Sequence, residues 1–171
     1  ALSVAGNLTT TGTLTAGTVS LSGDLSHTGS GSFSVTTLVF QRAGTQTADF
    51  YGSNARVTNL TVNAGTTLSS PNYWTLNFWG ALTNNGSVSL PNATLVANGT
   101  SAQSMGGTKP VTLGSLQINN AAGLTLNVNL AVNNVLTLTS GVISAPASTV
   151  ILDKLCTQGA VTGGSSSSYV D

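Results

Sequence analysis

Residues that could do chemistry are few and scattered in this sequence. Asp24, Ser26 and His27 are the types found in a nucleophilic triad, and His27 is the one histidine of the chain. A triad needs a nucleophile on a strained turn, an oriented base and an oxyanion hole, whereas these residues sit in an ordinary turn. Asp24 and Asp49 could meet on neighbouring turns as the two carboxyl groups of a polysaccharide hydrolase or lyase. We expect ordinary surface aspartates here, and the sequence predicts no catalytic residue and no enzyme.

Metal and cofactor sites are not expected either. His27 and Cys156 are each single in the chain and lie far apart, which does not fit the ligand spacing of a zinc site. No Asp-rich loop of the calcium-binding kind is present. Cys156 cannot form an internal disulfide, and we interpret it as a small half-buried hydrophobe.

The aromatic cluster from Tyr73 to Trp79 is the best candidate for a binding site. Leu76 and Phe78 fit the alternation as inward residues, so Trp74 should also point inward, and Tyr73 and Trp79 should point outward. Outward aromatic rings on a neutral, amide-rich surface suit contacts with a sugar ring or with a protein. A strand of this length separates the two rings by roughly 20 Å, so they cannot sandwich one sugar. Local packing is the alternative interpretation of both side chains.

The elements that must position these residues are predicted from composition and periodicity. Only 5% of the residues are charged, compared with about 25% in an average domain. Thr, Ser and Asn make up 65 of the 171 residues. The four scattered basic residues do not form the stripe that nucleic-acid binding needs. No apolar run approaches the roughly 18 residues of a membrane span, so neither nucleic acid nor membrane insertion is expected.

Short runs in which apolar residues alternate with Thr, Asn or Ser predict β-strands throughout the chain, with Asn and Gly at the turns. These runs recur: Leu25–Phe33 matches Leu82–Leu90 at an offset of 57, and Leu60–Val62 matches Leu116–Ile118 at 56. Three copies, about 1–57, 58–113 and 114–171, cover the chain as one domain. Each copy divides into thirds of about 19 residues, the size of one solenoid rung.

The sequence therefore predicts an all-β, right-handed parallel β-helix (β-solenoid) of about nine rungs. A β-sandwich is the competing architecture, because it also alternates apolar and polar residues between turns. The section 42–56 and its counterpart 99–110 interrupt the pattern and are predicted to be longer excursions from the rungs. Residues 161–171 are small and polar and are predicted to form a linker or loop.

The segments Thr100–Thr108, Leu116–Leu126, Val135–Ser144 and Val161–Asp171 (T-S-A-Q-S-M-G-G-T, L-Q-I-N-N-A-A-G-L-T-L, V-L-T-L-T-S-G-V-I-S and V-T-G-G-S-S-S-S-Y-V-D) together resemble repeat segments of very large secreted surface proteins of Bacteroidota. The resemblance implies export across both membranes by the type IX secretion route and a role in adhesins, filaments or cell-surface stalks. It brings no catalytic residue with it.

The expected function is a structural extracellular module at the cell surface, part of a longer protein, that acts as a stiff spacer. Both ends of a solenoid are open sheet edges, so we expect head-to-tail self-association or stacking on neighbouring repeats. The alternative is a carbohydrate-binding module that uses Tyr73 and Trp79 on a surface polysaccharide. Ice binding and a polysaccharide lyase are weaker alternatives, because the repeat keeps no outward Thr column and no acidic pair.

Overall fold

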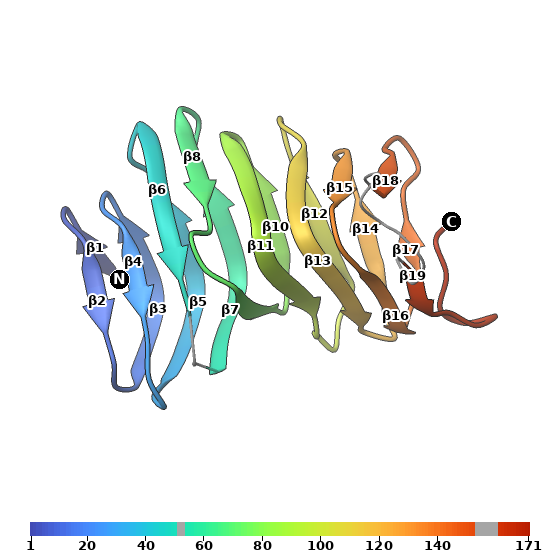
Figure 1. Cartoon of the computed structure of the whole chain (residues 1–171), viewed down its shortest axis with the longest axis horizontal. Coiled ribbons are helices and arrows are strands. Elements are labelled where there is room, and N and C mark those ends of the chain that lie inside the picture. The colour runs from blue at the N-terminus through green and yellow to red at the C-terminus, as the bar shows by residue number, and fades with distance from the viewer. Residues whose placement is uncertain (51–53, 153–160) are drawn as a thin grey trace.

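The computed structural model describes residues 1–50, 54–152 and 161–171 of the chain. Within them the chain forms 19 strands and no helix, and the strands stack in parallel as a β-solenoid of about seven turns. Figure 1 shows the turns side by side along the long axis, with the two termini at opposite ends. This confirms the predicted all-β solenoid. Cys156 lies outside the described residues.

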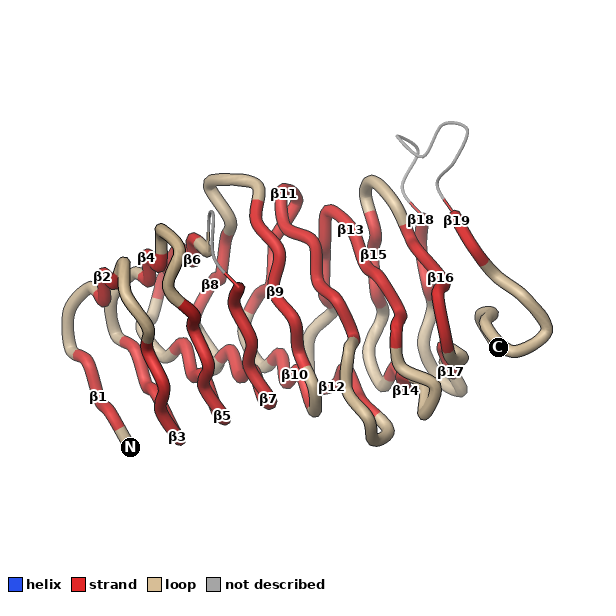
Figure 2. Tube along the Cα trace, turned by 90° about the horizontal axis from the view of Figure 1, so that it is seen from below, coloured by secondary structure: helices blue, strands red, loops and turns tan. Residues whose placement is uncertain are grey.

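The strand pairings form three parallel stacks, which we call faces A, B and C (Figure 2). Face A contains β1 (Leu2–Val4), β10 (Ala81–Asn84), β12 (Gln103–Gly107), β14 (Leu124–Leu126) and β17 (Ile143–Ser144). Face B contains β2 (Leu8–Thr10), β4 (Leu25–His27), β6 (Gly44–Asp49), β8 (Thr66–Ser69), β15 (Leu130–Val132) and β18 (Val150–Leu152). Face C contains β9 (Trp74–Phe78), β16 (Leu136–Ser140) and β19 (Val161–Gly163).

The longer strands bend round a corner and belong to two faces each. The strands β3 (Leu14–Leu21), β5 (Ser32–Phe40) and β7 (Asn54–Val62) run from face C to face A. The strands β11 (Ser87–Ala97) and β13 (Val111–Asn119) run from face B to face C, and the register between them shifts at that corner. Each turn therefore passes through A, B and C in order.

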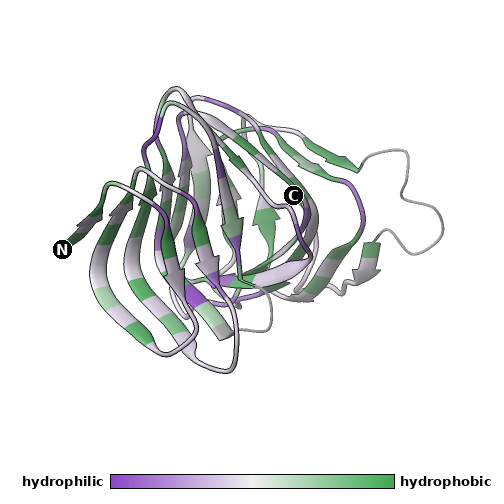
Figure 3. Ribbon diagram, turned by 60° about the vertical axis from the view of Figure 1, so that its left-hand side comes forward, coloured by the Kyte–Doolittle hydropathy of each residue, from purple (hydrophilic) through white to green (hydrophobic). Residues whose placement is uncertain are grey.

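Alternation decides which side chains enter the core. In β3, Val19 and Leu21 are fully buried, while Ser20 between them is only partly buried on the outer side. The next turns place Leu38 and Leu60 in line with Val19, each at most 1% exposed. Figure 3 shows hydrophobic residues (green) alternating with more polar ones along the strands. Because backbone groups pair between turns, a continuous apolar column can form without leaving them unpaired.

A row of rings occupies the interior at the corner between faces B and C. The centroids of His27 and Phe33 are 5.4 Å apart, those of Phe33 and Phe50 are 5.2 Å apart, and those of Phe50 and Trp74 are 5.1 Å apart. Trp74 is 6% exposed, and its Nε1–H donates to the carbonyl of Ala48 at 2.8 Å. The prediction that Trp74 points inward is confirmed.

Two buried glutamines hold corners between faces: Gln46 lies at a corner from face A to face B, and Gln103 lies at a corner from face C to face A. We call them the corner glutamines. The Oε1 atom of Gln103 accepts from the N–H of Gly99 at 3.0 Å, and its Nε2 donates to the carbonyl of Phe78 at 2.6 Å. Gln46 accepts from the N–H of Arg42 at 2.8 Å in the same way and donates to two carbonyls of the preceding turn. A buried side-chain amide can thus provide hydrogen-bond partners for the backbone N–H and C=O groups of a corner, where the pairing between strands is interrupted.

The predicted number of rungs is wrong. Leu2 lies beside Val19, and Ile143 lies beside Val170, so single turns take between 17 and 27 residues. The prediction of about nine rungs of 19 residues is corrected to about seven turns. The corners cause the difference, because they vary in length while the strand pattern between them stays the same.

The sequence match at an offset of 57 does not correspond to a whole number of turns. Leu38 pairs with Leu60 on face A, whereas its match Leu95 pairs with Leu76 on face C. Apolar couplets look alike on all three faces, since each needs the same inward alternation. Similar sequences therefore occupy different faces.

The predicted excursions are more regular than expected. Section 42–56 contains β6 and the start of β7, so its irregular part within the described residues is the corner beside Gln46. The predicted loop 161–171 also begins with a strand, β19, which pairs with β16. Val170 then forms a parallel bridge with Ile143.

Candidate functional site

Tyr73 lies just before β9 and is 74% exposed. It lines a surface hollow of about 470 Å³ with Thr28, Asp49, Pro71 and Asn72. Asn72 Nδ2 donates to Asp49 Oδ2 at 2.7 Å across this hollow. An exposed phenol beside one carboxylate offers an aromatic face and hydrogen-bonding groups, but no second acid lines the hollow among the described residues.

Trp79 lies just after β9, at the other end of the strand, and is only partly exposed. It lines a separate hollow of about 390 Å³ on face C. The guanidinium carbon of Arg56 lies 4.6 Å from the centroid of a Trp79 ring. One face of the indole is therefore occupied by a cation rather than free for a sugar. Tyr73 and Trp79, the two predicted contact residues, belong to different hollows.

The register explains why Arg56 reaches Trp79. Arg56 on β7 is paired with Asn77 on β9, and Trp79 follows two positions later on the same outer side. Diagonal neighbours of this kind are about 7–8 Å apart at the backbone, within reach of a long side chain. From the sequence alone Arg56 is one of four scattered basic residues, because the 21-residue step between β7 and β9 cannot be known without the corner lengths.

Asparagines line the outer side of face C next to Trp79. Asn98 Nδ2 donates to Asn77 Oδ1 at 3.5 Å, and Asn119 Nδ2 donates to Asn98 Oδ1 at 3.0 Å. Asn77 Nδ2 in turn donates to the carbonyl of Ala55 at 3.3 Å. These amides run from one turn to the next and give the surface hydrogen-bonding groups without charge.

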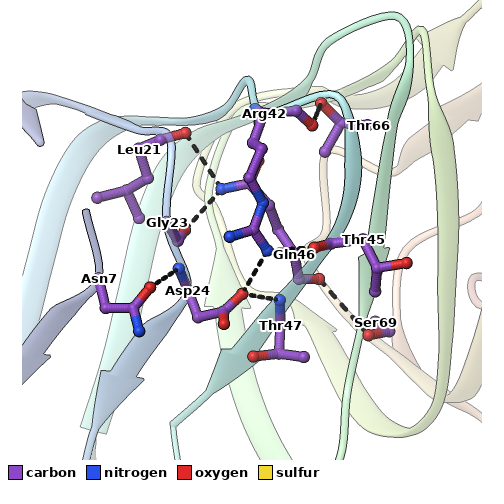
Figure 4. A network of polar contacts seen from close by, with 10 residues as sticks. All are labelled: Asn7, Leu21, Gly23, Asp24, Arg42, Thr45, Gln46, Thr47, Thr66 and Ser69. Atoms are coloured by element: carbon purple, nitrogen blue, oxygen red, sulfur yellow. Dashed lines mark hydrogen bonds and ion pairs between the residues drawn. The ribbon is translucent and has the colours of Figure 1, made fainter. Parts of the chain in front are cut away.

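Asp24 and Arg42 form the one ion pair found among the described residues, with Nη2 and Oδ1 2.9 Å apart (Figure 4). Asp24 Oδ1 also accepts from the N–H of Thr47 at 2.9 Å, and the N–H of Asp24 donates to Asn7 Oδ1 at 2.9 Å. Arg42 further donates to the carbonyl of Thr45. The network joins three successive turns around the corner that Gln46 occupies. These hydrogen bonds hold the corner in place.

His27 does not lie beside a nucleophile. It is fully buried, with Nδ1 2.9 Å from Thr10 Oγ1 and Nε2 3.3 Å from the carbonyl oxygen of Gly31. A carbonyl can only accept, so Nε2 carries a proton in this arrangement. Ser26, with the opposite parity, points to the outer side. The structure therefore does not bring the three candidate triad residues together.

The two candidate acids lie on adjacent turns of face B. Asp49 is paired with Ser26, and Asp24 lies two positions before Ser26, so the carboxylates are diagonal neighbours. Asp24 is held by Arg42, while Asp49 accepts from Asn72 and lines the Tyr73 hollow. The described residues contain no group of three or more His, Cys, Asp or Glu side chains that could hold a metal ion.

The outward residues of face A do not form a continuous threonine ladder. Ser20, Val39, Thr61 and Thr83 follow one another from turn to turn, and Gly106 comes next. The mixed column offers no flat array of identical hydroxyl groups in the described residues. Nothing in this register favours ice binding.

Comparison with known proteins found no matching family model, no matching curated protein and no matching solved structure. The resemblance to Bacteroidota surface proteins therefore stays a prediction from sequence segments. The described residues contain no helix that is both long and apolar enough to cross a membrane.

Proposed function

We propose that this chain is a structural module of an extracellular adhesin stalk or surface filament, and that its solenoid stacks end to end with a neighbouring repeat or subunit. The observation that carries the proposal is where the exposed apolar side chains lie. Among the described residues the large exposed ones are Leu2, Tyr73, Ile151, Leu152, Val161, Tyr169 and Val170. All except Tyr73 belong to the first or the last turn.

The outer end of the first turn leaves apolar side chains of the core columns partly exposed. Leu2 is 39% exposed, whereas Val19, which follows it in the same column one turn later, is fully buried. Leu8 and Leu14 are likewise only partly buried, although they continue the columns of faces B and C. One more turn stacked on this end would bury all three side chains.

The same edge also has free backbone positions. The strands β1 and β2 each pair with a strand on one side only, β3 and β4 respectively, within the described residues. Unpaired edges template addition of another strand, and parallel stacking would extend the ladder with the pairing used inside the solenoid. Burial of apolar side chains and backbone pairing thus both favour the same arrangement, a further parallel turn stacked on β1 and β2.

A surface module of this kind would act through its length and stiffness. Stacked backbone hydrogen bonds and a continuous core resist bending and proteolysis. The shortage of charge and the abundance of Thr, Ser and Asn leave solubility to neutral polar groups. Together with the sequence resemblance, these features support a location outside the cell, and the proposal assigns no catalytic step to the chain.

Sedimentation velocity over a range of concentrations tests the stacking. We expect species larger than one chain whose proportion increases with concentration. Leu2→Lys should weaken this association about tenfold or more, because it removes apolar contact and places a charge without a partner in the stacked interface. Ser3→Lys is the matched control, since it puts the same charge on the next residue of β1 but on the outer side. A chain that stays monomeric at all concentrations, or that responds equally to both variants, would refute the proposal.

A further inference from the structure

The hollow beside Trp79 on face C is a second surface feature, independent of the ends. It spans β5, β7 and β9, and the polar side chains around it come from Ser32, Ser34, Arg56, Asn77 and Asn98. At about 390 Å³ it is large enough for one or two sugar rings and too open to enclose an apolar ligand.

Arg56 differs from the other described arginine in having no acidic partner. Arg42 is paired with Asp24, whereas no carboxylate of the described residues lies within 4.0 Å of Arg56. Within the described part of the chain, its guanidinium makes one hydrogen bond, from Nη2 to Ser34 Oγ at 3.2 Å. A guanidinium has five N–H donors, so most of them are free to meet a ligand.

The guanidinium is nevertheless held in place. It stacks on Trp79 at 4.6 Å and is tied to Ser34 on the neighbouring turn. A cation fixed over an aromatic ring loses less freedom when it binds, and its fork geometry matches a carboxylate. Trp79 thereby supports Arg56, and the side of its ring that faces Arg56 is not available to a sugar.

The other groups that line the hollow determine which kind of anion fits beside Arg56. Ser34 and Asn98 offer a hydroxyl and an amide, and no second cation of the described residues lines the hollow. A doubly charged phosphate would therefore be only half neutralised here. A singly charged carboxylate that carries several hydroxyl groups fits the set better.

We propose that this hollow binds a carboxylated sugar residue, such as a uronate unit of an acidic polysaccharide. The carboxylate takes the free N–H donors of Arg56, and ring hydroxyl groups exchange hydrogen bonds with Ser34 and Asn98. The site does not depend on end-to-end stacking, since every residue that forms it lies on the side of the solenoid.

Calorimetric titration of the full chain with a short oligogalacturonate tests the site, and the methyl-esterified oligosaccharide is the neutral matched ligand. We expect the acid to bind wild type at least about tenfold more tightly than the ester does, as one charge-assisted hydrogen-bond pair provides. Arg56→Gln should remove this difference and Arg56→Lys should restore part of it. Lys109→Gln, which removes an exposed cation elsewhere, should change the affinity by less than about twofold.

Several outcomes would overturn the proposal. They are no measurable binding of the acid by wild type, equal binding of acid and ester, or an equal loss in Arg56→Gln and Lys109→Gln. Displacement of the oligosaccharide by inorganic phosphate at the same concentration would show a general anion site and would also overturn it. Circular dichroism of each variant, unchanged because Arg56 and Lys109 are both exposed, confirms that the fold is intact.

Discussion

Replacing the corner glutamine Gln103 by methionine should destabilise the solenoid although it keeps the size of the side chain. Gln103 is 2% exposed and makes its hydrogen bonds inside the core. The N–H of Gly99, a buried residue, has Gln103 Oε1 as its partner at 3.0 Å. A buried donor left without a partner costs about 1–3 kcal/mol.

Two further hydrogen bonds are lost without leaving an orphan. The carbonyl of Phe78 also accepts from the N–H of Asn98 at 3.2 Å, and Asn120 Nδ2, which donates to Gln103 Oε1 at 2.8 Å, also reaches the carbonyl of Ser101 at 2.8 Å. Each such loss costs about 0.5–1.5 kcal/mol. The expected total is therefore about 2–6 kcal/mol in the free energy of unfolding.

Urea denaturation followed by circular dichroism measures this difference. Gln117→Met is the matched control, because Gln117 lies on the outer side of β13 and donates only to Thr139 Oγ1, at 3.1 Å in an exposed bond. It should change stability by less than about 0.5 kcal/mol. Because turns of a solenoid contact only their neighbours, hydrogen exchange should show the loss first at the amide of Gly99. If Gln103→Met cost no more than Gln117→Met, the assignment of the corner to buried hydrogen bonds would be wrong.

Three further substitutions test the stacking of the turns. Gly141→Ala should prevent correct folding of the last turns, seen as loss of soluble expression, because Gly141 has a φ of +93° and an added Cβ would lie 1.8 Å from the carbonyl oxygen of Asn120. Gly17→Ala should instead leave the melting temperature unchanged or raise it slightly, by up to about 1 kcal/mol of stability, because no atom lies within 4 Å of its added Cβ. Trp74→Phe should lower stability by about 1–3 kcal/mol in urea denaturation, since it removes the Nε1–H that satisfies the carbonyl of Ala48 at 2.8 Å; an unchanged midpoint would contradict this.

Alternation was sufficient to predict the fold class and the side-chain orientation. The parity of Leu76 and Phe78 predicts that Trp74 points inward, and Trp74 is 6% exposed. Parity is a local property, because successive residues of a strand point to opposite faces whatever the rest of the chain does. The predicted orientation of a side chain is therefore correct even where the predicted number of turns is wrong.

Anything that depends on which residues are neighbours across turns was not predictable in the same way. The pairs Arg56–Trp79 and Asp24–Arg42 join residues 23 and 18 positions apart, and their meeting depends on the length of each corner. Corner length is set by features such as the buried Gln46, which the sequence pattern does not distinguish from an outward glutamine such as Gln117. A single residue gained at a corner would change the sequence separation of every pair of neighbours that the corner joins.

This separation bears on how such a solenoid could acquire a binding function. Inward positions are constrained on every turn, because a polar residue there destabilises the core unless it finds a hydrogen-bond partner inside it. Outward positions are constrained only by solubility, so Ser34, Arg56 and Asn77 can change independently while the column beneath them, formed by Phe33, Ala55 and Leu76, stays apolar. A binding site can therefore be built across three turns without any change to the core, and the length of the rod and the chemistry of its side are separate properties of one chain.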